Sequence, residues 1–171
     1  EEGLRKKLDR IMEIIEDVES LLTRNRIFID RMKGVGAISK EDAIDWGWTG
    51  PCLRSTGVPY DVRAAAPYAV YDRVDFDIPV GDHGDNYDRY LVRMREIRES
   101  RKIILQCLDQ IKDTPETLFV EDPRLIMPKK EKVHHAIEEL MNHFKIIIDG
   151  IQVPAGEAYS YVEGANGELG F

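Results

Sequence analysis

Hydrophobic residues recur at helical spacing in three stretches of the chain. The first stretch carries Leu4, Leu8, Ile11, Ile15, Val18 and Leu22. The second carries Tyr90, Met94, Ile97, Ile104, Leu108 and Ile111. The third carries Val133, Ile137, Leu140, Met141, Phe144, Ile147 and Ile148. Apolar residues three and four apart share one face of an α-helix, so the pattern predicts three amphipathic helices. They would occupy residues 1–33 (a helix and its exit) and, as an antiparallel helical hairpin, residues 87–150.

Residues 34–86 have weak apolar periodicity and many Gly and Pro residues. Ser39 before an acidic turn predicts a short helix that it caps and that ends near Gly47. The rest of this segment is expected to be irregular. Such long irregular stretches are often functional or packed against another part of a protein.

The last residues, 151–171, predict a short β-hairpin. Ala158–Val162 and Glu168–Phe171 flank the turn signal Asn166-Gly167. The second strand is expected to be truncated, because it has barely begun when the sequence stops. Its exposed edge predicts β-pairing between copies, a homodimer that would be an artefact of truncation.

Together these elements predict a mainly α fold. It is a helical bundle of three longer helices with an irregular Gly/Pro-rich middle segment and a short C-terminal β-hairpin. With 171 residues and 43% hydrophobic residues, the chain fits a single domain, 1–171, with its own core. The formal net charge of −8 argues against nucleic acid as a partner, because phosphate binding requires a basic surface. No apolar run is long enough to cross a bilayer.

A self-contained catalytic or metal site is not predicted. Cys52 and Cys107 are 55 positions apart without a CxxC partner, which favours two buried free thiols over a disulfide and excludes a four-cysteine cluster. The four histidines are interpreted as surface and boundary residues. Serine-hydrolase, phosphate-loop and HExxH motifs are absent, so we assign no catalytic residue and no metal ligand.

Acids and arginines alternate through the middle segment and into the second helix. The members are Arg54, Asp61, Arg63, Asp72, Arg73, Asp75, Asp77, Asp82, Asp85, Asp88, Arg89 and Arg93. A structural ion network is the favoured interpretation, because the planar guanidinium binds carboxylates bidentately and can hold irregular backbone in place. Its proposed members are Arg54, Asp61, Arg63, Asp85, Asp88 and Arg89. Cation binding, and proton or quinone chemistry shared with another subunit, remain as alternatives.

The central motifs are specific to one family. They run from Thr49-Gly50-Pro51-Cys52-Leu53-Arg54 through Gly57-Val58-Pro59-Tyr60-Asp61, Phe76-Asp77-Ile78-Pro79-Val80-Gly81 and Gly84-Asp85-Asn86-Tyr87-Asp88-Arg89-Tyr90 to His143-Phe144-Lys145 and Val153-Pro154-Ala155-Gly156-Glu157. In this order they resemble the D-type subunit of NADH:quinone oxidoreductase, respiratory complex I. This D-type subunit is related to the large subunit of nickel–iron hydrogenases.

The resemblance implies that the chain is a central fragment of a longer subunit built around a helical bundle. That subunit packs on the one that carries the terminal iron–sulfur cluster, and together they form the quinone cavity above the membrane arm. The chain would therefore scaffold the quinone-reducing module of a complex that couples electron transfer to proton translocation. It would lie peripherally at the cytoplasmic face of the inner (plasma) membrane.

The resemblance also bears on cofactors. The full complex uses FMN, iron–sulfur clusters, NADH and quinone, whereas this chain is expected to bind none of them and to be inactive in isolation. Cations near a reduced cluster raise its potential, so Arg26 and Arg31, at the end of the first helix, are candidates for residues near the terminal cluster. Arg101 stands where the family usually has Leu, and it is expected to snorkel or to pair with an acid.

Two other hypotheses remain open. The chain could be a fragment of a large-subunit relative from a membrane-bound energy-converting hydrogenase, which cysteine pairs flanking this region would indicate. It could also be a non-catalytic interaction domain without a redox partner.

Overall fold

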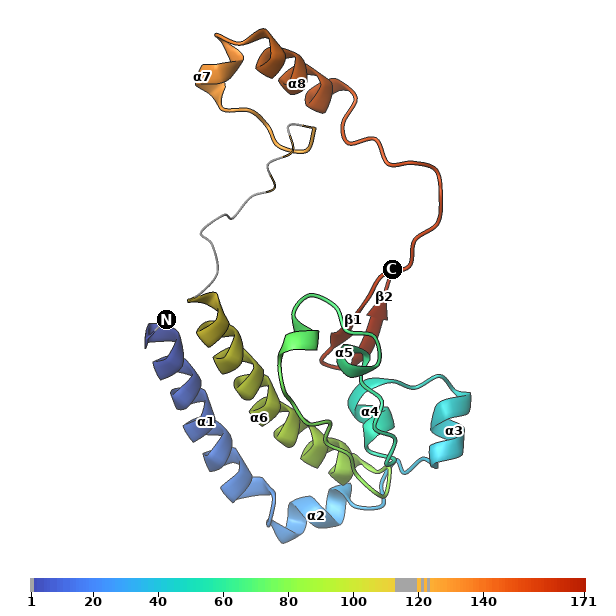
Figure 1. Ribbon diagram of the computed structural model, residues 1–171. Helices are drawn as coiled ribbons and strands as arrows, with labels where there is room; N and C mark the ends of the chain where they lie inside the picture. The colour runs from blue at the N-terminus through green and yellow to red at the C-terminus, as the bar shows by residue number, and fades with distance from the viewer. Residues whose placement is uncertain (1, 113–119, 121, 123) are drawn as a thin grey trace. The chain divides into compact units, whose positions relative to one another are not determined.

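The computed structural model describes residues 2–112, 120, 122 and 124–171. The chain divides into two compact units, residues 1–113 with 159–171 and residues 114–158. Figure 1 gives the course of the elements. The expectation that residues 1–171 form a single domain stays a prediction.

Two long helices form one side of the first unit. Helix α1 spans Glu2–Leu22 and helix α6 spans Asn86–Ile111, and the two are in contact. Arg5 near the start of α1 pairs with Asp109 near the end of α6, at 2.6 Å. The helices therefore run antiparallel, as Figure 1 also shows.

The first predicted helix ends before Arg26 and Arg31, the two arginines that were expected at its end. Helix α1 stops at Leu22, and Asn25 caps a separate helix, α2 (Arg26–Met32), by accepting from two backbone N–H groups. Arg26 consequently begins α2, whereas Arg31 lies in its last turn. Of the two, Arg31 is the one at a helix end where positive charge suits the dipole.

The middle segment contains short helices rather than long ones. Ser39 caps α3 (Lys40–Asp45) as predicted, accepting from the N–H of Asp42. Then follow α4 (Gly50–Arg54), α5 (Val62–Ala65) and the 3-10 turn η1 (Tyr71–Arg73). The expected irregular segment is thus a chain of short helical turns. Both cysteines are free, as favoured, but neither is fully buried.

The C-terminal hairpin is confirmed with a shifted turn. Strand β1 (Tyr161–Gly164) pairs antiparallel with β2 (Gly167–Gly170), and Gly164 is opposite Gly167. The two-residue loop is therefore Ala165-Asn166, one position before the predicted Asn166-Gly167 turn. Strand β1 contacts α5 and β2 contacts α4, so the hairpin has the support that a lone hairpin needs.

The core of the first unit is small and is built largely by α6. The buried apolar residues are Leu8, Ala43, Leu53, Val62, Val92, Met94, Ile103 and Leu108. The predicted stripe of α6 is partly wrong: Met94 and Leu108 are buried, but Ile111 is 58% exposed and Ile103, not Ile104, is in the core. Arg98 and Arg101 of α6 pair with acids of α1, so the side of α6 that meets α1 is not purely apolar.

The described residues of the second unit form two helices where one was predicted. Helix α7 (Lys130–Val133) is separated from α8 (Ile137–Ile148) because Ala136 adopts extended backbone, φ −125° and ψ 122°. The intervening histidines are weak helix formers. The apolar face of α8 is exposed within the described residues, with Ile137 and Ile148 at 66% and 62%. The predicted antiparallel packing of the second and third long helices stays a prediction.

Candidate functional site

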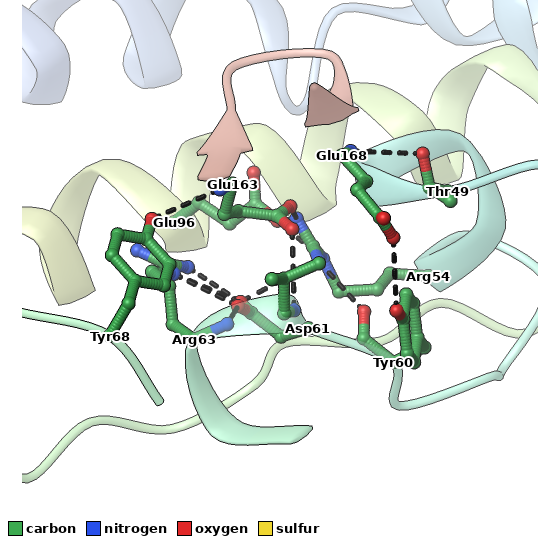
Figure 2. Close-up of polar contacts among 10 residues, drawn as sticks. Thr49, Arg54, Tyr60, Asp61, Arg63, Tyr68, Glu96, Glu163 and Glu168 are labelled. Carbon is green, nitrogen blue, oxygen red and sulfur yellow. Dashed lines mark hydrogen bonds and ion pairs between the residues drawn. The ribbon is translucent and has the colours of Figure 1, made fainter. Parts of the chain in front are cut away.

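A buried cluster of ionisable side chains joins three segments of the first unit (Figure 2). At its centre is Arg54, at the last position of α4, with a side chain that is 1% exposed. The guanidinium is placed inside because α4 ends against α6 and β2, both of which it contacts. A buried cation requires hydrogen-bond acceptors, and the surrounding residues supply them.

The acceptors of Arg54 come from distant parts of the chain. Its Nε donates to Glu96 Oε1 at 2.7 Å, from α6, and its Nη2 donates to Glu163 Oε1 at 2.9 Å, from β1. Its Nη1 donates to the carbonyl oxygen of Tyr60 at 2.9 Å. These charge-assisted bonds attach the helix and the hairpin to the middle segment.

A second arginine completes the cluster through Asp61. Arg63 binds this carboxylate bidentately, with Nε to Oδ1 at 3.0 Å and Nη2 to Oδ2 at 2.6 Å. Asp61 also caps α5 by accepting from the N–H of Arg63. Burial alone would raise the pKa of Asp61, but the hydrogen bonds and charges of Arg63 and Arg54 lower it below its usual value.

Aromatic residues border the cluster on the side of Arg63. Its guanidinium lies over the rings of Tyr71 and Phe76, at 5.7 and 5.0 Å from their centroids. The hydroxyl of Tyr68 accepts from the N–H of Glu163 at 3.0 Å. Burial raises the pKa of Tyr71, so this phenol stays neutral at physiological pH.

Polar side chains also attach the hairpin at its second strand. Glu168 accepts from the hydroxyl of Tyr60 at 3.0 Å, and its N–H donates to Thr49 Oγ1 at 3.0 Å. Gly50 and Gly167 have positive φ, +65° and +131°, and lie so close that a Cβ on Gly50 would be 2.3 Å from the Cα of Gly167. Only glycine permits this approach.

The other predicted network residues form a separate cluster at the start of α6. Asp85 caps the helix by accepting from the N–H of Asp88, and it also accepts from the N–H of Gly34 at 2.7 Å. Asp88 accepts from the N–H groups of Asp82 and His83, at 2.8 and 2.6 Å. These bonds lower the pKa of Asp88, although burial opposes them.

Arg89 binds backbone rather than acids. Its Nη2 donates to the carbonyl oxygens of Gly36 and Gly84, at 2.6 and 2.8 Å, and its guanidinium lies over the ring of Trp48. The predicted residues therefore fall into two groups: Arg54, Asp61 and Arg63 in the buried cluster, and Asp85, Asp88 and Arg89 at the start of α6. Their role as a structural ion network stays a prediction.

Glu96, Glu163, Glu168 and Tyr60 were not among the predicted site residues. Glu96 is 42 positions from Arg54 in the sequence and Glu163 is 109 positions away. The local alternation of acids and arginines therefore could not predict that Glu96 or Glu163 binds Arg54.

The two candidates for residues near an iron–sulfur cluster lie on the surface of α2. Arg26 is 94% exposed and its Nε is 3.8 Å from Asp30 Oδ2, one helical turn away. Arg31 is also exposed. Both side chains are accessible to a partner.

Two kinds of feature are absent from the residues that the structure describes. No group of three or more His, Cys, Asp or Glu is arranged there to hold a metal ion. No helix in that part of the chain is long and apolar enough to span a bilayer.

Known proteins of one family match the whole chain. The family model for the respiratory-chain NADH dehydrogenase, 49 Kd subunit, matches residues 1–171. A D-type subunit of NADH-quinone oxidoreductase (number 2) from Anaeromyxobacter sp. (strain K) is 58% identical over 171 residues, which is 100% of this chain and 39% of the relative. The D-type subunit from Myxococcus xanthus (strain DK1622) is 55% identical over 168 residues, 98% of this chain and 40% of the relative.

A relative with lower sequence identity also matches most of the chain. The D-type subunit from Coxiella burnetii (strain RSA 331 / Henzerling II) is 47% identical over 161 residues, covering 94% of this chain and 39% of the relative. The chain thus spans about two fifths of the length of the curated relatives it matches.

Proposed function

The chain belongs to the family of the 49 Kd subunit of respiratory-chain NADH dehydrogenase, and from this membership we propose that it forms part of the quinone-reducing module of NADH:quinone oxidoreductase. The observation that carries the proposal is the family match over all of residues 1–171. It favours this function over that of a hydrogenase relative and over an interaction domain without a redox partner.

Within the module the chain acts as a scaffold. The buried cluster around Arg54 supports this role, because one guanidinium holds residues of α4, α6 and β1 in a fixed arrangement. A scaffold for a quinone cavity requires such rigidity, since small displacements of the groups that position a substrate reduce rates strongly. Electrons would reach the module from NADH through other subunits.

The partners follow from the same proposal. The chain would pack on the subunit that carries the terminal iron–sulfur cluster, with the membrane arm beneath, at the cytoplasmic face of the membrane. Arg26 and Arg31 on α2 are exposed and would face that cluster. The homodimer through the tail remains a separate expectation.

The experiment that tests the scaffold role compares the chain with the assembled complex. The purified 171-residue chain is expected to show no flavin or iron–sulfur absorbance and no NADH oxidation, whereas the complex that contains the full-length subunit shows all three. Circular dichroism of the purified chain provides the control for folding. A cluster bound by the folded chain, or measurable turnover, would contradict the proposal.

A further inference from the structure

The buried cluster contains one more acid than it has cations. Three carboxylates, Asp61, Glu96 and Glu163, face two guanidiniums, and the three side chains are 1%, 17% and 4% exposed. If all of them were ionised, the cluster would carry an excess negative charge away from water. An uncompensated buried charge is strongly unfavourable, so the cluster favours uptake of one proton.

Two of the three carboxylates have both oxygens occupied. Asp61 accepts from Arg63 with Oδ1 and Oδ2, and its Oδ2 is also 3.6 Å from Arg54 Nη1. Glu163 accepts from Arg54 with Oε1 and from the N–H of Val62 with Oε2, at 3.4 Å. A proton on either of these carboxylates would compete with a donor that already binds the same oxygen.

Glu96 differs from both. The two nitrogens that approach it, Nε and Nη2 of Arg54, both lie against Oε1, at 2.7 and 2.6 Å. Among the residues that the structure describes, none donates to Oε2. A proton can therefore bind to Oε2 while both contacts from Arg54 to Oε1 remain intact.

We propose that Glu96 Oε2 is a reversible proton-binding site that balances the charge of the cluster. One O–H bond forms with a proton from water, and the same bond breaks when the proton leaves. The 17% exposure of the Glu96 side chain gives water access to it. The charged groups that act on Glu96 are Arg54 from α4, Arg63 from α5 and Glu163 from β1. Asp61 caps α5 and lies 3.6 Å from Nη1 of the same Arg54.

The electrostatics support the assignment to this carboxylate. Burial raises the pKa of Glu96, the charges of Arg54 and Arg63 oppose the rise, and the charge of Glu163 adds to it; the net pKa is raised. The pKa of Asp61 is lowered despite burial, because Arg63 binds both of its oxygens. The excess proton consequently belongs on Glu96.

Proton binding at Glu96 changes the attachment of the hairpin. Glu96 and Glu163 bind the same nitrogen, Nη2 of Arg54, at 2.6 and 2.9 Å. When Glu96 is neutral, Arg54 is no longer shared between two like charges, and its bond to Glu163 strengthens. Protonation of Glu96 thus changes how strongly Arg54 binds β1. This role goes beyond that of a passive scaffold and does not depend on the proposed redox role.

Infrared difference spectroscopy of the assembled complex between low and high pH tests the proposal. The wild-type protein is expected to show a carboxylic-acid C=O band that shifts in D₂O and titrates at a pH above the ordinary glutamate value of about 4.3. Glu96→Gln removes this band. Glu138→Gln, an exposed site on α8, leaves it unchanged.

A second variant tests the charge argument with Glu96 intact. Glu163→Gln removes the excess negative charge, so the midpoint of the Glu96 band is expected to fall to a lower pH. Retention of the band in Glu96→Gln would overturn the proposal. An unchanged midpoint in Glu163→Gln would overturn it as well, and that result stands even if Glu96→Gln fails to assemble.

Discussion

Arg54 stabilises the fold because it neutralises buried acids that would otherwise lack a cation. Its Nε and Nη groups reach Glu96, Glu163 and the carbonyl oxygen of Tyr60. Removing one partner of a buried ion pair is strongly destabilising, because the remaining charges stay buried without compensation.

Arg54→Met is therefore expected to lower the free energy of unfolding by about 3–5 kcal/mol, the range for breaking a buried ion pair. Urea denaturation of the full-length subunit measures the change, as a lower midpoint with an unchanged slope. Arg73→Met is the matched control, because the Arg73 side chain is 63% exposed and its Nε is 3.8 Å from Asp72 Oδ1. Equal midpoints for the two variants would contradict the role assigned to Arg54.

Asp61 determines how the cluster responds to acid. Its folded-state pKa is lowered, so its stabilising contribution is fully present above the unfolded value of about 3.9 and is lost as the pH falls through the lower folded value. The stability difference between the wild-type protein and Asp61→Asn is expected to shrink between about pH 6 and about pH 3. Urea midpoints at the two pH values test this, with the exposed Asp30→Asn as control. A difference that stays constant would show that Asp61 does not titrate as described.

At the scale of elements, the hairpin is held to α4 by a close backbone approach. A Cβ on Gly167 would meet Thr49 Oγ1 at 2.4 Å and the N of Gly50 at 3.1 Å, and its φ of +131° is unfavourable for other residues. Gly167→Ala is expected to lose about 1–3 kcal/mol of stability, the cost of such backbone strain. It should also increase amide hydrogen exchange in β1 and β2.

Gly156→Ala is the matched control for the hairpin. Nothing lies within 4 Å of a Cβ at Gly156, and its φ is not in the left-handed region. Hydrogen exchange in the hairpin should be the same as in the wild-type protein. Equal exchange for Gly167→Ala and Gly156→Ala would contradict the close packing of the hairpin on α4.

Ion pairs join α1 to α6. Arg98 pairs bidentately with Glu19, and Arg101 donates to Asp9 at 2.6 Å, which confirms the expectation that Arg101 pairs with an acid. The hydrogen bond from Arg98 lowers the pKa of Glu19. Arg101 Nε, however, is buried without a partner among the described residues.

Arg101→Leu is expected to leave stability unchanged or to raise it. Leucine removes the unpartnered Nε and completes the apolar stripe of α6, and an exposed ion pair such as Arg101–Asp9 contributes little. The urea midpoint measures the effect, with Arg98→Leu as the contrasting variant, because Arg98 holds its acid with two nitrogens. A large decrease of the urea midpoint in Arg101→Leu would show that the Arg101–Asp9 ion pair stabilises the fold.

The sequence predicted local features better than distant ones. The cap at Ser39, the existence of the second amphipathic helix and the hairpin follow from neighbouring residues, and all three are confirmed. The division between α7 and α8 was missed because the apolar stripe continues through it. The acids that bind Arg54 were missed because Glu96 and Glu163 approach it only through tertiary contacts.

At the scale of the whole molecule, the chain combines a mainly α fold with a small core. In the first unit, buried ion pairs of Arg54 join α4 to α6 and to the hairpin. In the second unit the apolar residues of α8 are exposed, including Phe144 at 55%. These properties fit a segment of a larger assembly, and family membership supports that interpretation.

In the proposed function, the chain positions the quinone-reducing module and does not carry electrons itself. The direct measurement is a pair of assays on the complex with Arg54→Lys in the full-length subunit, because lysine keeps the charge but cannot reproduce the guanidinium geometry. NADH:quinone activity is expected to fall about tenfold or more, as for misplaced positioning groups. NADH oxidation by an artificial acceptor that takes electrons upstream of the quinone is expected to be unchanged. An equal loss in both assays of a fully assembled complex, or no loss in either, would contradict the account.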